Sequence, residues 1–323
     1  PPGAALCSVA PPAEPGRRGA ARWLQELRPD LVLWHGPLAD DPLLGAITES
    51  GRRAVAVDVP APAPSARRVV RSGLAAMHRT LARDAEAARA LREIGPPGAR
   101  IEIAGRFVAL REPPPCDATE RDHLAHVLEA RPVWLAVDPG AAEIAALLEA
   151  HRTALQGAHR LLLVVVPAAD EDGPGLARFL REQGWRVARR GAEGEPDDAT
   201  EIFVADSREE LGLWYRLAPL TCLGGTLAGG AVPDAAGPAS LGSALIAGPH
   251  GGDRAAFLDR LESAGGLHRL ARPGDLGGAV ATLLAPDRAA ALAHAAWDVA
   301  SDAARVRERV VAALRDALRA GDG

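Results

Sequence analysis

Short apolar runs and longer amphipathic segments alternate along most of the chain. In the first third, the pattern predicts a helix over Arg83–Ile94, which the Gly-Pro-Pro-Gly segment at 95–98 ends, and strands at 31–36, 54–60 and 101–106. Strands that alternate with helices are typical of α/β proteins with parallel sheets.

The pattern is more regular after residue 130. Most of the apolar runs there are separated by helical segments, which favours a doubly wound parallel sheet. We predict strands at 133–137, 161–166, 186–190, 201–206, 220–223 and 243–248. The end of the chain is helical, with an apolar stripe at four-residue spacing made by Val306, Val310, Leu314 and Leu318.

Prolines mark the best boundary between domains. Pro113, Pro114 and Pro115 can continue neither a helix nor a central strand. We therefore predict an N-terminal domain at 1–112, a linker at 113–118, a C-terminal domain at 119–300 and a C-terminal helix at 301–323. The predicted fold class is α/β, with two Rossmann-like doubly wound parallel-sheet domains facing a cleft that holds the ligand.

Composition narrows the function. The chain has 323 residues, 48% of them hydrophobic, which suffices for two cored domains. All 37 basic residues are Arg, and Lys and Asn are absent, as a GC-rich genome would produce. A net charge of −5 argues against nucleic-acid binding. Three distant cysteines give no metal spacing and favour a reduced, cytoplasmic setting. The longest strongly apolar run, 161–167, is too short to span a bilayer.

Two glycine turns carry the candidate chemistry. Gly224, Gly225 and Thr226 follow one predicted strand, and Gly248 and His250 follow the next. Glycine at a strand end lets backbone approach a ligand, and the following helix directs free N–H groups at an anion. We therefore predict these five residues to bind a donor phosphate or nucleotide. The alternative is that the glycines only make tight turns.

Other polar groups are weaker candidates. Ser207 with Glu210 resembles a capping box, and the same residues are candidates for holding a ribose hydroxyl. Thr119 with Asp122 resembles a further N-cap. His123 and His126 lie three apart on a predicted helix without a third ligand, so we predict no metal site. Nothing in the sequence indicates a cofactor.

Several segments, in order and spacing, resemble bacterial 3-deoxy-D-manno-octulosonic acid (Kdo) transferases. They are RPVWLAV, AHR, LLLVVVP, GWRVARR, DSREELGLWY, GGTL and AGPH, all within 115–300, with weaker similarity in 28–34 and 95–106. The resemblance implies a GT-B glycosyltransferase that moves Kdo from CMP-Kdo onto a lipid A precursor, at the cytoplasmic side of the inner membrane if it associates peripherally.

The chain departs from the family at residues that the resemblance implies are functional. Of a Ser-Thr-His-x-Gly-Glu segment only Glu143 remains, and an Arg-His-Pro segment is replaced by residues 168–170. The Glu expected to hold the ribose is Gly237, and an acceptor-side carboxylate falls on Gly36. The family strand whose Gly-Glu supplies the base, and its apolar anchor, precede the point where this sequence begins. No catalytic residue can be assigned. Codon bias does not explain the loss of Glu and His.

Three hypotheses remain open. The chain is a divergent transferase with a CMP-sugar donor and a lipid A-type acceptor, a non-catalytic binding or scaffold protein with the same fold, or a transferase with a different nucleotide sugar. Because one fold serves many functions, the fold alone does not choose among them.

Overall fold

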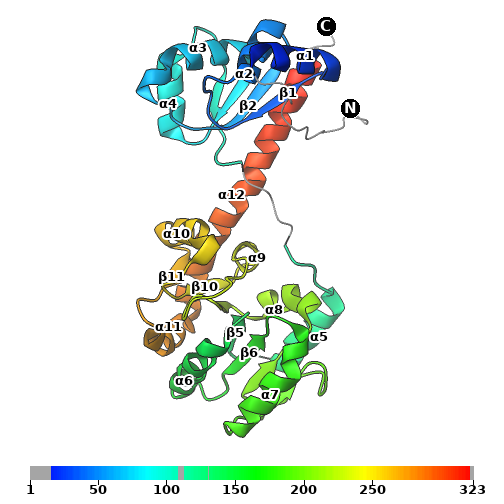
Figure 1. Ribbon diagram of the computed structural model, residues 1–323. Helices are drawn as coiled ribbons and strands as arrows, with labels where there is room; N and C mark the ends of the chain where they lie inside the picture. Colours follow the sequence, from blue (N-terminus) through cyan, green and yellow to red (C-terminus); the bar gives the residue numbers. More distant parts are fainter. Residues whose placement is uncertain (1–15, 108–112, 130, 321–323) are drawn as a thin grey trace. The chain divides into compact units, whose positions relative to one another are not determined.

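The computed structural model describes residues 16–107, 113–129 and 131–320. The chain divides into two compact units (Figure 1). Unit 1 comprises residues 1–110 and 302–323, and unit 2 comprises residues 111–301. The division lies next to the proline-rich segment, and the last part of the chain returns to unit 1.

Unit 1 contains a four-stranded parallel sheet in the order β1-β2-β3-β4. The strands are β1 (Val32–His35), β2 (Ala54–Val59), β3 (Met77–Ala82) and β4 (Ile101–Ile103). Three of them match predicted strands. The sequence pattern does not reveal β3, because its residues Met-His-Arg-Thr-Leu-Ala form no apolar run. Since neighbouring strands follow one another in the chain, the described part of this sheet is wound in one direction.

Four helices supply the core on one face of this sheet. They are α1 (Arg17–Leu27), α2 (Pro42–Ser50), α3 (Arg67–Ala76) and α4 (Ala85–Ile94). Their buried side chains, among them Leu24, Ile47, Leu74 and Leu91, form one cluster with Ala54 and Ala56 of β2. The predicted helix over Arg83–Ile94 is α4, and the side chain of Asp84 caps it by accepting from the Ala87 amide at 2.8 Å.

The long helix α12 (Pro286–Arg319) covers the other face. Its Val306, Val310, Ala313 and Ala317 pack with Val55 and Val57 of β2 and Leu81 of β3. The predicted stripe holds for Val306, Val310 and the half-buried Leu314, and alanines complete it. Unit 1 therefore buries both faces of its sheet only with help from the end of the chain.

Unit 2 contains a seven-stranded parallel sheet in the order β11-β10-β9-β5-β6-β8-β7. Its strands are β5 (Val133–Val137), β6 (Leu162–Val166), β7 (Val187–Arg189), β8 (Ile202–Val204), β9 (Leu220–Leu223), β10 (Ala244–Ala247) and β11 (Leu267–Arg269). Six match predicted strands and β11 was not predicted. The order reverses between β5 and β9, so this sheet is doubly wound as expected.

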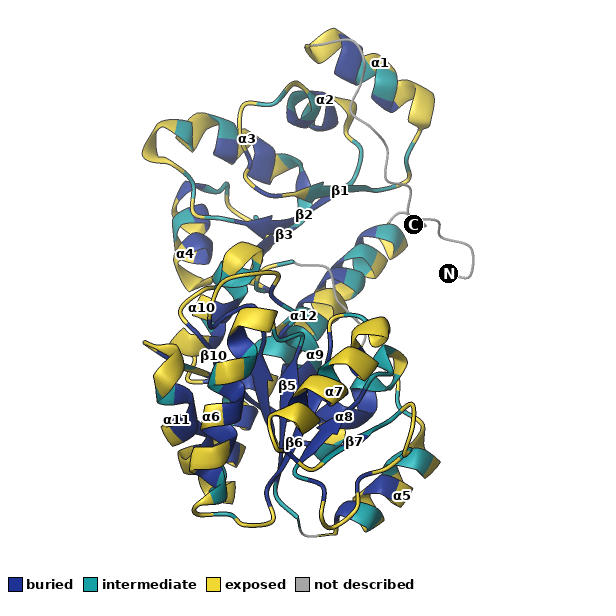
Figure 2. Cartoon of the chain, turned by 60° about the horizontal axis from the view of Figure 1, so that its bottom comes forward, coloured by how far each residue is buried: buried dark blue, intermediate teal, exposed yellow. Residues whose placement is uncertain are grey.

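Helices cover both faces of the second sheet. They are α5 (Ala118–Leu128), α6 (Ile144–Leu155), α7 (Gly173–Glu182), α8 (Leu211–Leu217), α9 (Ala236–Ser240), α10 (Ala255–Ser263) and α11 (Leu276–Leu283). Those of α6, α7 and α11 pack with Trp134 and Leu163 on one face, and those of α5 and α8 with Leu135 and Val164 on the other. Figure 2 shows β5 and β6 buried beneath helices whose outer faces are exposed.

Helix caps differ from two predictions. Asp117, not Thr119, caps α5: its Oδ1 accepts from the amides of Thr119 and Glu120 at 2.8 and 3.1 Å. Ser207 precedes a short 3-10 helix (Arg208–Glu210) but makes no side-chain cap hydrogen bond, and Glu210 pairs elsewhere, so the capping box is not formed. Among the described helices, none has the length and apolar character needed to cross a bilayer.

Candidate functional site

The loops after β5 and β9 meet where the strand order of unit 2 reverses. In open α/β sheets this position, at the carboxyl ends of the strands, is where ligands bind. The two loops are in close contact, since a Cβ added to Gly224 would lie 2.1 Å from the carbonyl oxygen of Asp138. Glycine at 224 is therefore required by the crossing of the two loops.

The glycine turns predicted from the sequence lie side by side. Thr226 joins them: its hydroxyl donates to the Leu223 carbonyl and accepts from the Gly248 amide at 2.8 Å, and its carbonyl accepts from the His250 amide at 3.0 Å. A Cβ on Gly248 would lie 2.2 Å from the Thr226 carbonyl oxygen. Thr226 is fully buried and its hydroxyl is used within the chain.

The amides of the first turn are also engaged within the chain. The Gly224 amide donates to Val137 O at 2.7 Å. The Gly225 amide donates to Glu143 Oε2 at 2.7 Å, and those of Leu227 and Ala228 donate to Glu143 Oε1 at 2.6 and 3.1 Å. Gly225 has φ +69, which glycine adopts without strain.

Glu143 therefore occupies the position that the sequence suggested for a bound anion. Its side chain is 1% exposed, and a fourth amide, that of Gly140, donates to Oε2 at 2.9 Å. Its charge contributes, after burial, to raising the pKa of the neighbouring Cys222 thiol to about 12, so that thiol is inert. The remnant of the family's Ser-Thr-His-x-Gly-Glu segment closes this loop from inside.

A cation and a carboxylate lie at the same edge. Arg208 binds Asp138 with both terminal nitrogens, Nη1 to Oδ1 and Nη2 to Oδ2, the latter at 3.2 Å. Nη1 also donates to Pro167 O at 2.8 Å, and the Arg208 amide donates to Asp170 Oδ1 at 2.9 Å. The hydrogen bond to Asp138 raises the pKa of Arg208. The Arg208 side chain remains 36% exposed.

Arg208 lies beside the segment in which the resemblance places the family's Arg-His-Pro. That segment is residues 168–170 here, directly after Pro167 and including Asp170. Sequence reasoning missed Arg208 because its neighbours Ser207 and Glu210 looked like a helix cap. Asp138 has φ +52, an uncommon conformation for a residue with a side chain. Its position at a strand end was noted, but a plain turn was favoured.

The position of the family's ribose-binding Glu is closed. A Cβ added to Gly237 would lie 3.2 Å from Tyr215 Cε2 and 3.5 Å from Pro114 Cδ. Burial, and then the charge of Asp138, raise the pKa of the Tyr215 hydroxyl well above its ordinary value, so it is a neutral phenol at pH 7. A glutamate at 237 would require Tyr215 or Pro114 to move.

The remaining predicted site residues lie at the rim. Glu210 accepts from Arg190 Nε at 2.8 Å and from Nη2 at 2.6 Å, and Arg190 also binds Glu120. Glu210 thus ties the loop after β7 to the start of α8. Ser207 is half-buried next to Arg208, and the side chain of His250 is exposed.

The described residues contain no cluster of His, Cys, Asp and Glu that could hold a metal ion. His123 pairs with Glu195, Nε2 to Oε2 at 2.7 Å.

No protein-family model matches the chain. Two curated relatives match parts of it. The 3-deoxy-D-manno-octulosonic acid transferase of Haemophilus influenzae is 31% identical over 97 residues, which are 30% of this chain and 23% of that protein. The probable mitochondrial 3-deoxy-D-manno-octulosonic acid transferase of Arabidopsis thaliana is 28% identical over 141 residues, 42% of this chain and 31% of that protein. The matches thus span between a quarter and a third of each relative's length.

Two solved structures share the fold. The C-terminal CMP-Kdo binding domain of WaaA from Acinetobacter baumannii superposes with a TM-score of 0.52 and 24% identity, covering 56% of this chain and 96% of that domain. UDP-GlcNAc 2-epimerase from Neisseria meningitidis, bound to UDP-GlcNAc, superposes with a TM-score of 0.50 and 11% identity, covering 93% and 79%. The chain is therefore similar to the Kdo transferases, as its motifs indicate, and it has an α/β fold of the GT-B kind with two Rossmann-like domains.

Proposed function

We propose that the protein is a divergent glycosyltransferase of the Kdo transferase type, whose unit 2 binds a CMP-sugar. The observation that carries the proposal is Arg208. It supplies a guanidinium at the carboxyl edge of the second sheet, beside the residues that replace the family's Arg-His-Pro. Its contacts to Asp138 and Pro167 leave the Nε–H and one Nη2–H without a bond to any described residue.

A guanidinium in this position suits a phosphate, because charge-assisted hydrogen bonds are about twice as strong as neutral ones. In transfer from a CMP-sugar, the bond between the anomeric carbon and the phosphate oxygen breaks and the phosphate carries away the electron pair. Arg208 would stabilise that developing charge. Ser207 and the exposed His250 are the additional polar groups that we propose for donor binding, with Glu210 holding the loop in place.

One observation favours a non-catalytic binding protein instead. Glu143 occupies the amides of Gly225, Leu227 and Ala228, and Gly237 is enclosed by Tyr215 and Pro114. A donor phosphate that needed those amides, or a ribose that needed a carboxylate at 237, would find neither. The transferase proposal therefore depends on side chains at the rim.

Calorimetric titration of the protein with CMP and CMP-Kdo tests the proposal, with UMP and UDP as controls for the base. We expect cytidine-selective binding that Arg208→Gln weakens about tenfold or more, equivalent to at least ~1.4 kcal/mol. Arg178→Gln is the matched control, because Arg178 is exposed on α7, and it should leave the Kd unchanged. Failure of CMP and CMP-Kdo to bind at millimolar concentration would exclude the transferase and favour the non-catalytic alternative.

A further inference from the structure

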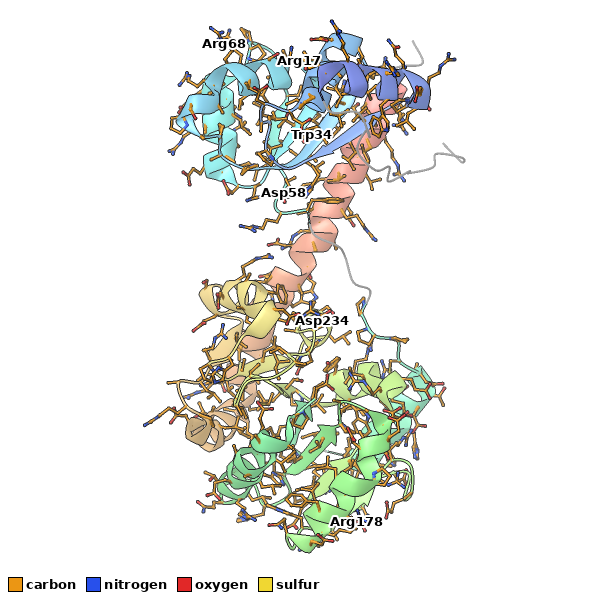
Figure 3. All side chains as sticks on the ribbon, in the orientation of Figure 1. Arg17, Trp34, Asp58, Arg68, Arg178 and Asp234 are labelled. Atoms are coloured by element: carbon orange, nitrogen blue, oxygen red, sulfur yellow. The ribbon has the colours of Figure 1, made fainter. Side chains whose placement is uncertain are left out.

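Three polar side chains lie together at the carboxyl edge of the first sheet. His35 is the last residue of β1, Asp58 lies near the end of β2, and Arg83 follows β3 directly. The three strands are parallel neighbours, so their carboxyl ends meet at one edge. Figure 3 labels Asp58 in this unit. None of the three residues falls on a family segment that the sequence motifs identify.

Asp58 has an unusual backbone for a residue inside a strand. Its φ is +53, and the pairing of β2 with β3 shifts register between Ala56 and Val59. Such irregularities redirect a side chain and occur often beside active sites. Here the result is a carboxylate only 9% exposed, placed between a cation and an imidazole.

Both carboxylate oxygens of Asp58 have a partner. Arg83 Nε donates to Oδ1 at 2.7 Å, and His35 Nε2 lies 3.4 Å from Oδ2. The guanidinium offsets the charge of the carboxylate, so Asp58 can be nearly buried. The remaining oxygen fixes the imidazole with Nε2–H toward it. Contacts of this kind are often long without substrate and shorten when it binds.

The other nitrogen of His35 then carries the lone pair. The side chain is 57% exposed, and the Phe107 ring lies against it with a centroid distance of 6.3 Å. An imidazole held at Nε2 by a nearly buried carboxylate, with Nδ1 as the acceptor, has the arrangement of a His–Asp pair that removes a proton from a hydroxyl group.

Resting on the proposed function, we propose that His35 is the general base of the transfer and that Asp58 positions it. Transfer forms a bond from the acceptor's hydroxyl oxygen to the anomeric carbon of the sugar. The bond from that carbon to the phosphate of CMP breaks, and its electron pair leaves with CMP. The hydroxyl proton moves to Nδ1 of His35, and from the imidazolium it passes to solvent.

The experiment follows CMP release from CMP-Kdo in the presence of a lipid A precursor. We expect His35→Ala to lower kcat by about 10²–10⁴-fold and to leave the Kd for CMP unchanged. Added imidazole should restore at least tenfold of the lost rate, because it can take the proton that His35 takes. Asp58→Asn should also lower kcat, but imidazole should not restore it, since His35 is still present.

His78→Ala is the matched control. His78 lies near the amino end of β3 in the same sheet and also faces a carboxylate, Asp316 Oδ2, at 3.3 Å. This variant should keep kcat within twofold. If His35→Ala keeps the wild-type kcat, or if it binds CMP normally yet gains nothing from imidazole, the assignment of the base is wrong and the transferase stands. A wild-type protein that binds CMP-Kdo but releases no CMP also overturns the assignment. Absence of donor binding overturns the proposed function itself.

Discussion

The carboxyl edges of the two sheets are built in opposite ways. In unit 2, backbone amides converge on the edge, and the chain satisfies them with its own Glu143 and Thr226. In unit 1, side chains converge on the edge, and one of them, His35, is more than half exposed. A glycine-rich turn is therefore not in itself an open anion site. Whether a buried carboxylate has already taken its amides decides what the turn can bind.

Removing Glu143 should break this difference most strongly. Glu143→Ala leaves the amides of Gly140, Gly225, Leu227 and Ala228 without their acceptor. Buried donors without partners are costly, at about 1–3 kcal/mol each and not additively, so we expect unit 2 to lose about 4 kcal/mol of unfolding free energy in chemical denaturation. Glu149→Ala is the control, because Glu149 is exposed on α6; it should change stability by less than ~0.5 kcal/mol.

The same variant offers a sharper test. With the carboxylate gone, the amides form an empty anion site, so inorganic phosphate should raise the Tm of Glu143→Ala and leave that of the wild type nearly unchanged. An equal response of the two proteins would show that these amides do not form an anion site.

The two units also treat histidine in opposite ways. His151 of unit 2 is fully buried: Trp134 Nε1 donates to its Nδ1 at 3.2 Å, and its Nε2 donates to Glu201 O at 3.0 Å. Burial lowers the pKa of His151 to about 4, whereas unfolded His titrates near 6.5. Because the unfolded chain binds the extra proton first, stability is complete above about pH 6.5 and falls as the pH drops toward 4.

The loss should be about 3 kcal/mol over that range. His151→Gln removes the titrating group, so its unfolding free energy should depend less on pH between 6.5 and 4 than that of the wild type. Denaturation curves at a series of pH values compare the two. A wild type with unchanged stability at pH 4.5 would contradict the assignment of His151 as a buried neutral imidazole.

Thr226 gives the smallest expected effect. Thr226→Val keeps the shape but leaves the Leu223 carbonyl and the Gly248 amide without partners, at a cost of about 2 kcal/mol. Thr226→Ser retains the hydroxyl and should lose less than ~1 kcal/mol. Measuring CMP binding in parallel separates the two roles considered for this residue. A structural hydroxyl lowers stability without changing the Kd, whereas a ligand-binding hydroxyl changes the Kd as well.

The strands of unit 2 could be predicted from sequence because continuous apolar runs mark strands buried on both faces. Strand β3 could not, since His78 and Arg79 face partly polar surroundings and pair with Asp316 of α12. The glycine turns were found, but the filling of the first turn by Glu143 was not, because residues 143 and 225 meet only in the folded sheet. Asp58 escaped notice for a similar reason: a strand pattern does not reveal a left-handed φ.

The return of α12 to unit 1 affects the order in which the protein acquires its structure during synthesis. Val306, Val310, Ala313 and Ala317 cover one face of a sheet whose strands all precede residue 104. When those strands leave the ribosome, that apolar face has no partner, and it gains one only when the last residues emerge. Unit 2 contains no segment that must wait in this way. The unit translated first is therefore completed last, and a ribosome that stalls before residue 302 releases a chain with an uncovered sheet.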